Sequence, residues 1–202
     1  MLRHLVDLPN LFTLAGLSCG LLGIFFAAQG AFSAAMIAML WACAFDWFDG
    51  LIARRMAGRS DEERAFGAQL DSLADLVSSG VCPAVVLLSY GEFGAWYLPG
   101  AILLVAAGAV RLAHYNLHGM ADEATYQGLA IDNNILVLSL LFLFEGSFER
   151  DTFAKVLYGT IVVLATLGVS SLRTPKFVGR WYYVFAVLVV GLTGVYASRL
   201  LA

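Results

Sequence analysis

The segment FSAAMIAMLWACAFDWFDGLIA (Phe32–Ala53) decides how this chain must fold. It is almost wholly apolar, and it is long enough to cross about 30 Å of hydrocarbon as one helix, which takes about 20 residues. Two aspartates, Asp46 and Asp49, nevertheless lie toward its C-terminal end. An ionisable side chain in a membrane helix is costly unless it is paired, hydrated or bound to a metal ion. The segment therefore predicts a membrane-spanning helix that carries a functional site.

The composition of the whole chain agrees with a membrane protein. Of the 202 residues, 60% are hydrophobic and 13% are charged, about half the charged share of a soluble domain. Disordered, collagen-like, coiled-coil and nucleic-acid-binding chains need more charge or a different repeat, so these classes are excluded. The cysteines Cys19, Cys43 and Cys82 lie in separate apolar runs, which argues against a disulfide framework or a zinc site. We expect one integral-membrane domain over residues 1–202.

Seven apolar stretches are candidate spans, so we predict an all-α, polytopic transmembrane helical bundle. They are Leu11–Ala28, Phe32–Ala53, Phe66–Tyr90, Ala95–Leu112, Ile131–Phe144, Thr152–Leu172 and Trp181–Leu201. The fifth is the shortest, and it spans the membrane only if Glu145 and Gly146 lie at its exit. Asp7, Pro9 and Asn10 suggest a short interfacial segment before the first span.

The distribution of Lys and Arg predicts the orientation of the bundle. With seven alternating spans, nine cationic residues fall on one side, and Arg150, Lys155 and Arg199 fall on the other. Because cytoplasmic loops carry an excess of Lys and Arg, the first side is expected to be cytoplasmic. We therefore expect a multi-pass protein of the cell (inner or plasma) membrane, with its N-terminus inside and its C-terminus outside.

Three glycines on the first span, Gly16, Gly20 and Gly23, permit close helix packing. Packing inside the bundle is the simpler expectation, and a contact in a homodimer is the alternative.

The next span adds two acids, Asp71 and Asp75. Asp46 and Asp49 are three residues apart, and Gly67, Asp71 and Asp75 recur every four residues, so each set shares one helix face. In the predicted topology, both sets lie near the cytoplasmic ends of adjacent antiparallel helices. Four carboxylates in one small volume repel one another unless a cation lies among them. A hard divalent cation with oxygen ligands, Mg²⁺ or Mn²⁺, meets this need.

Two other interpretations of the acids are open. They could be solvated at helix ends, although the small residues Gly50, Ala53 and Gly67 on the same faces leave space for a ligand to approach the backbone. A cation transporter would place its acids near the membrane midplane, often on broken helices. Here all four lie toward one side, and no proline lies near them.

The complete pattern is D-x2-D-G-x2-A-R over Asp46–Arg54, then twelve residues, then G-x3-D-x3-D over Gly67–Asp75. It resembles the signature of the CDP-alcohol phosphatidyltransferases at all eight fixed residues. The spacer is longer than is usual in that family, and we expect its polar segment Arg59–Arg64 to form a longer cytoplasmic loop. The string P-N-x2-T at Pro9–Thr13 also resembles an N-terminal element of the family.

The resemblance implies a role for each matching residue. In the family, one or two divalent metal ions hold the pyrophosphate of a CDP-linked donor. By position, the metal ligands are Asp46, Asp49, Asp71 and Asp75, and the catalytic residues are Asp75, as the general base, and Asp71. Binding of the donor falls to Asn10, Thr13, Asp46, Gly50, Ala53, Arg54 and Gly67.

Three further strings are similar to bacterial and archaeal phosphatidylserine synthases: Asp71–Ala84, Arg111–Asn116 and Ser170–Phe177. This branch implies transfer of the phosphatidyl group from CDP-diacylglycerol to L-serine, with release of CMP. Another acceptor, such as glycerol 3-phosphate, inositol phosphate or another small alcohol, is the alternative. The residues assigned to acceptor binding are Arg111, His114, Asn116, Asp132, Arg173 and Lys176.

The string Asp132-Asn133-Asn134 departs from the pattern of that branch. Three polar residues at the start of a membrane helix need a partner or a cavity. One interpretation is an altered acceptor pocket, in which Asp132 pairs with an acceptor amine or with Arg111. The other is an N-cap of the fifth span at the membrane interface.

Overall fold

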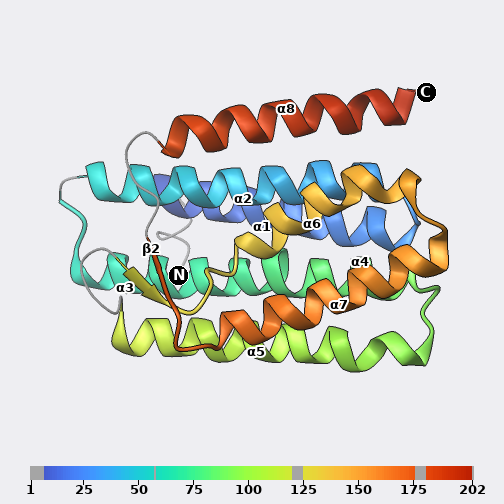
Figure 1. The fold of residues 1–202 in the computed structure, drawn as a ribbon. Coiled ribbons are helices and arrows are strands. Elements are labelled where there is room, and N and C mark those ends of the chain that lie inside the picture. The colour runs from blue at the N-terminus through green and yellow to red at the C-terminus, as the bar shows by residue number, and fades with distance from the viewer. Residues whose placement is uncertain (1–6, 57, 120–124, 176–180, 202) are drawn as a thin grey trace.

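The computed structural model describes residues 7–56, 58–119, 125–175 and 181–201. Within these ranges, the chain folds into long helices and one short β-ribbon (Figure 1). The helices are α1 (Leu8–Ala28), α2 (Phe32–Arg55), α3 (Asp61–Asp75), α4 (Cys82–Tyr90), α5 (Leu98–His118), α6 (Asn133–Leu141), α7 (Arg150–Gly168) and α8 (Trp181–Leu201). The strands are β1 (Thr125–Gln127) and β2 (Arg173–Pro175).

In the described part of the chain, 6 helices are long and apolar enough to cross a membrane. A shorter apolar helix over Asn133–Ser147 corresponds to the fifth stretch of the sequence, and it combines α6 with a 3-10 helix over Phe142–Ser147. The prediction of a polytopic helical bundle is therefore confirmed.

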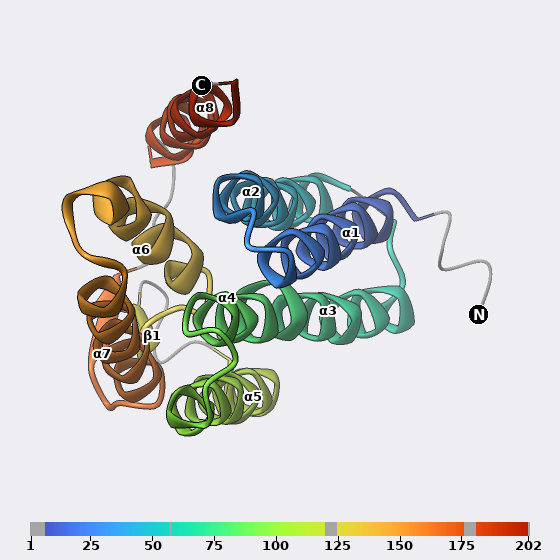
Figure 2. The same cartoon turned by 90° about the vertical axis from the view of Figure 1, so that its right-hand side faces the viewer.

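Most of the helices run roughly along one direction, and α6 and α7 are inclined to them (Figure 1). Helices α1, α5 and α7 pack around α4 (Figure 2). Helices α1 and α2 form an antiparallel hairpin that packs against α3 and α4. Helix α5 packs on the other side of α4 and contacts α7. Helix α8 lies at the edge of the bundle and packs along α2.

Helix α1 begins at Leu8, so the expected interfacial segment is part of the helix itself. Pro9 occupies its first turn, where a missing backbone N–H costs nothing, and Asn10 follows it. The Pro9-Asn10 pair therefore marks the start of the first span.

The polar segment Arg59–Arg64 is also more ordered than the sequence analysis expects. Ser60 is the N-cap of α3, and its hydroxyl accepts a hydrogen bond from the backbone N–H of Glu63. The Glu63 carboxylate accepts one in return from the backbone N–H of Ser60, at 2.9 Å. This capping box satisfies N–H groups at the helix start, so most of the expected loop is the first turn of α3.

Helices α3 and α4 form one span, Asp61–Tyr90, that contains a π-helical segment over Leu76–Val81. Pro83 follows this segment and has no backbone N–H, so the Ser79 carbonyl loses its α-helical donor. The Nδ2 atom of Asn134 donates to the Ser79 oxygen at 2.9 Å. The span therefore contains an irregular turn directly after Asp75, which the sequence analysis missed.

The glycines of α1 pack inside the bundle, as the simpler expectation has it. A Cβ on Gly20 would lie 2.9 Å from Ser78 Cβ, and one on Gly23 would lie 2.8 Å from Cys82 Sγ. A Cβ on Gly16 would lie 3.2 Å from the Ala42 carbonyl oxygen. These contacts bring α1 close to α2 and to the π-helical segment.

The two strands tie together the chain segments before α6 and after α7. They pair antiparallel, with Thr125 opposite Pro175 and Gln127 opposite Arg173. Gly128 follows β1 with φ of 74°, and a Cβ there would lie 2.2 Å from the Gly168 carbonyl oxygen. This turn sets where the chain enters α6 and therefore where Asp132 lies.

Candidate active site

The aspartates of α2 and α3 meet inside the bundle. Carboxylate oxygens of Asp46, Asp49 and Asp71 lie within 4.8 Å of one another. They converge because α2 ends where α3 begins, so residues near the end of α2 face residues of the antiparallel α3 (Figure 1). The geometric expectation from the sequence is therefore met for these acids.

Asp75 belongs to a second group, which contains an acid from another helix. Carboxylate oxygens of Asp46, Asp75 and Asp132 also lie within 4.8 Å of one another. Asp46 thus belongs to both groups, and Asp132 brings a fifth carboxylate into the cluster.

The polar string before α6 is explained by these contacts. Asp132 stands at the N-cap position, but its side chain makes no capping hydrogen bond and is directed to the aspartates. The Asn133 amide donates to the Ala130 carbonyl at 3.0 Å, and Asn134 holds the π-helical segment. The N-cap interpretation is therefore wrong for the side chain of Asp132, which lies at the site.

Thr13 holds one of the carboxylates in place. The Thr13 hydroxyl is buried, and it lies within hydrogen-bond distance of Asp49 Oδ2 and of the Pro9 carbonyl oxygen. Its position on α1 thus supports Asp49 directly. This contact adds to the role in donor binding that the family resemblance implies for Thr13.

Gly67 lies against the side chains of Asn10 and Arg59. A Cβ there would lie 3.2 Å from Asn10 Oδ1 and 2.9 Å from Arg59 Nη2. Asn10 itself is 1% exposed. The side chains of Asn10 and Arg59 thus occupy part of the space at Gly67 that was expected to admit a ligand.

Arg59 is a buried cation, although its segment is expected to form a loop. Its Nη2 atom lies 2.6 Å from Asp7 Oδ2 and also donates to the Glu63 carbonyl oxygen at 3.2 Å. The pair fastens the start of α1 to the start of α3. The S-x-x-E capping signal at Ser60–Glu63 was the available sign that this segment is ordered.

The other expected donor-binding residues lie on the last turns of α2. Gly50 and Ala53 are half-buried there. Arg54 belongs to the same helix, and its side chain lies outside the part of the chain that the structure describes.

Arg111 is the cation next to the second group of acids. On α5, it interacts electrostatically with Asp75 and with Asp132. It also lines a cavity of about 100 Å³ together with His114, Gln127 and Ser170. Two of the expected acceptor residues, Arg111 and His114, therefore share one cavity, and Arg111 connects it to the second group of acids.

Asn116 and Arg173, which are also expected to bind the acceptor, do not line this cavity. The Ser72 hydroxyl donates to Asn116 Oδ1 at 3.1 Å, which joins α3 to α5. Arg173 lies in β2, opposite Gln127, and Lys176 lies outside the described residues. His114 and His118 stack on each other with ring centroids 4.4 Å apart.

This arrangement can hold a hard cation and accept a proton. The ligands on offer are carboxylate oxygens, which Mg²⁺ and Mn²⁺ prefer over sulfur or imidazole. Two groups of acids that share Asp46 offer room for one or two ions.

Comparisons with known proteins identify the family of this chain. The family model of the CDP-alcohol phosphatidyltransferases matches residues 6–190. CDP-diacylglycerol–serine O-phosphatidyltransferase of Helicobacter pylori strain J99 is 32% identical over 175 residues, covering 84% of this chain and 72% of that protein. Archaetidylserine synthase of Methanothermobacter thermautotrophicus is 31% identical over 175 residues, covering 86% of this chain and 72% of that protein. CDP-diacylglycerol–serine O-phosphatidyltransferase of Bacillus subtilis strain 168 is 31% identical over 175 residues, covering 84% of this chain and 90% of that protein. The chain therefore belongs to the CDP-alcohol phosphatidyltransferase family and is an enzyme of that class.

Proposed function

We propose that this enzyme transfers the phosphatidyl group from CDP-diacylglycerol to the hydroxyl of L-serine, which gives phosphatidylserine and CMP. The observation that carries the proposal is the cluster of carboxylates around Asp46, built on the eight-residue signature of the family. Family membership favours this reaction over cation transport. The names of the relatives, which include serine phosphatidyltransferases and an archaetidylserine synthase, support serine as the acceptor.

The residues present fit a divalent metal site. Asp46, Asp49 and Asp71 would hold one Mg²⁺ or Mn²⁺ ion, and Asp75 would contribute to a second site with Asp46. Bound there, a divalent cation would neutralise charge on the phosphate oxygens of the donor. Thr13 keeps the Asp49 carboxylate oriented toward this task.

Asp75 is the proposed general base, with Asp71 beside it. Asp75 takes the proton of the acceptor hydroxyl, and the freed oxygen attacks the phosphorus atom that carries the diacylglycerol. The bond between this phosphorus and the bridging oxygen breaks, and CMP leaves with that oxygen. A carboxylate among other carboxylates suits this role because its neighbours favour proton uptake.

The charges around Asp75 suit an amino acid acceptor. Serine carries an ammonium group and a carboxylate, and the site offers Asp132 and Arg111 as opposite charges. We assign the ammonium group to Asp132 and the carboxylate to Arg111, and His114 lines a cavity together with Arg111. Acceptors that carry a phosphate group would need more cations than this cavity provides.

The acyl chains of the CDP-diacylglycerol donor require the reaction to take place at the membrane. We propose a multi-pass protein of the cell membrane with its active site facing the cytoplasm, since Arg111 and the start of α3 lie on the side with nine cationic residues. Membrane lipids and a second copy of the chain in a homodimer are further proposed partners.

A panel of acceptors tests the reaction and its metal together. Purified protein would be incubated with labelled CDP-diacylglycerol and, separately, with serine, glycerol 3-phosphate, inositol phosphate or ethanolamine. We expect CMP release with serine, its loss when a chelator is added, and its return with Mg²⁺ or Mn²⁺. Release with another alcohol but not with serine would contradict the acceptor assignment. Full activity in the chelator would contradict the metal site.

A further inference from the structure

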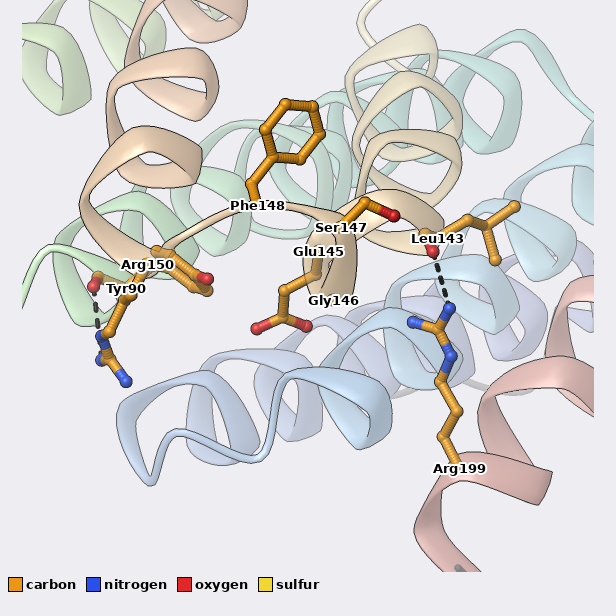
Figure 3. A pocket seen from close by; sticks show the side chains of 8 residues that line it. All are labelled: Tyr90, Leu143, Glu145, Gly146, Ser147, Phe148, Arg150 and Arg199. Atoms are coloured by element: carbon orange, nitrogen blue, oxygen red, sulfur yellow. Dashed lines mark hydrogen bonds between the residues drawn. The ribbon is translucent and has the colours of Figure 1, made fainter.

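A cavity of about 660 Å³ lies at the end of the bundle away from the aspartates. It opens where α4 ends, where α7 begins and where α8 ends (Figures 1 and 3). Its size is that of a pocket for a small organic molecule. The reaction proposed above makes no use of it, because the carboxylates lie toward the opposite end of the bundle.

Three charged side chains face this cavity in the order cation, anion, cation. In Figure 3, the Glu145 carboxylate lies between the guanidinium groups of Arg150 and Arg199. The lining thus carries one net positive charge. Because charged groups in a shared cavity select ligands of complementary charge, this order favours a ligand with an ammonium between two anionic groups.

Both arginines are held in place by backbone carbonyls. Arg199 donates from Nη1 to the Phe142 oxygen at 3.0 Å and from Nη2 to the Leu143 oxygen at 2.7 Å. Arg150 donates to the Tyr90 oxygen at 3.4 Å, and its guanidinium lies 5.2 Å above the Tyr90 ring. A guanidinium has five N–H donors, so each arginine keeps donors for an anion.

The other charged side chains near this end of the bundle do not neutralise the net positive charge of the cavity lining. Glu92 lies 3.5 Å from Arg150 Nε, but both side chains are largely exposed, so this pair is weak. Lys155, the third cation that the sequence places on this side, pairs with Asp151 at 2.6 Å and does not line the cavity. Lys155 therefore provides a matched control.

Exposed apolar side chains lie at the cavity and next to its lining residues in the sequence. Phe148 lines the cavity and is 45% exposed. Phe144 precedes Glu145 and is 60% exposed, and Leu201 lies two residues after Arg199 and is 90% exposed. On a membrane-spanning bundle, such side chains contact acyl chains rather than water. A ligand with a charged head group and apolar tails therefore fits the cavity and its surroundings together.

We propose that this cavity binds the head group of a serine phospholipid, whose ammonium lies between a phosphate and a carboxylate. Glu145 accepts from the ammonium, and Arg150 and Arg199 donate to the two anionic groups. The site would hold this lipid at the membrane face opposite the carboxylate cluster. Its occupancy does not require the activity proposed above, because any serine phospholipid in the membrane supplies the ligand.

Native mass spectrometry of the purified protein in detergent tests this site with defined lipids. Phosphatidylserine, phosphatidylethanolamine and phosphatidylglycerol would be added at equal concentration. We expect phosphatidylserine to be retained about tenfold more tightly than phosphatidylglycerol, which has no ammonium group. Equal retention of the three lipids would overturn the proposal.

Variants separate this cavity from the active site. Arg150→Gln should weaken retention of phosphatidylserine about tenfold, and Glu145→Gln should remove the preference for it over phosphatidylglycerol. Lys155→Gln and Asp46→Asn should leave unchanged both the retention of phosphatidylserine and its preference over phosphatidylglycerol. Arg199→Gln also removes two hydrogen bonds that hold α8. Its lipid retention is therefore interpreted together with a thermal unfolding measurement of the same variant. If Asp46→Asn loses the lipid while Glu145→Gln keeps it, the lipid occupies the active site and the proposal is wrong.

A soluble head group distinguishes a lipid from a free phosphoamino acid. Retention of phosphatidylserine in the presence of equimolar O-phosphoserine would support a lipid site. Displacement by it would overturn the assignment to a lipid.

Discussion

Asp75 and Asp71 stand one helical turn apart on α3, yet they belong to different groups of carboxylates. Asp71 lies with Asp46 and Asp49, whereas Asp75 lies with Asp46 and Asp132 and interacts electrostatically with Arg111. This division supports different roles for two residues that the sequence places on one stripe.

Asp75→Asn tests the role of the general base. An amide of the same shape accepts a hydrogen bond but takes up no proton near neutral pH, so turnover should fall by about 10²-fold or more. Binding of CDP-diacylglycerol, measured by calorimetric titration with the metal present, should stay within about threefold of the unchanged protein. Asp49→Asn is the matched control, since it should weaken donor binding. If Asp75→Asn also loses the donor, Asp75 acts mainly as a metal ligand.

Arg59→Gln tests the ion pair that fastens the start of α1. The Arg59 and Asp7 side chains are 8% and 12% exposed, so the change leaves Asp7 as a buried charge without its partner. The loss should be about 3–5 kcal/mol of unfolding free energy, seen as a lower midpoint in thermal unfolding in detergent.

Arg64→Gln is the control for this pair, because Arg64 is an exposed arginine in the first turn of α3. The double variant Arg59→Gln, Asp7→Asn should recover part of the stability. An unchanged midpoint for Arg59→Gln would show that the pair contributes nothing.

At the scale of elements, close packing of α1 sets the position of the acids. Gly20 faces the π-helical segment that follows Asp75, and Thr13 on the same helix contacts Asp49. A displacement of α1 therefore moves a support of the site as well as the core.

Gly20→Val should push α1 away from Ser78, because a Cβ at this position already lies 2.9 Å from Ser78 Cβ and 3.0 Å from its Cα. We expect a loss of about 1–3 kcal/mol of stability from overpacking, together with lower activity. Gly191→Ala is the matched control, since no described atom would lie within 4 Å of its Cβ. A stable and fully active Gly20→Val would contradict the coupling between this contact and the site.

At the scale of the molecule, the bundle has an acidic site toward one end and the charged cavity at the other. The proposed orientation places the first toward the cytoplasm and the second outside. Glu62, in the first turn of α3, and Glu149, before α7, are exposed markers of the two ends.

Single cysteines at these markers test the orientation. In a variant whose Cys19, Cys43 and Cys82 are replaced by alanine, Glu149→Cys should react with a membrane-impermeant maleimide in intact cells. Glu62→Cys should react only after the membrane is opened. The reverse pattern would place the aspartates outside and contradict the proposed localisation.

The sequence alone determines where the membrane spans lie and which of the acids share a helix face. Length and hydrophobicity fix the spans, because a chain in hydrocarbon must satisfy its backbone hydrogen bonds internally and so forms helices. The spacing of Asp46, Asp49, Asp71 and Asp75 fixes which of them share a helix face, since the period of a helix is local. The meeting of these acids followed from the short connection between antiparallel helices.

Only the tertiary structure decided which distant residues complete the site. Asp132 is far from Asp46 in the sequence, and its place among the acids depends on the turn at Gly128 and on the bond from Asn134 to Ser79. The burial of Arg59 likewise depends on Asp7, from another element. Such contacts follow from how helices pack in three dimensions, and no local period in the sequence encodes them.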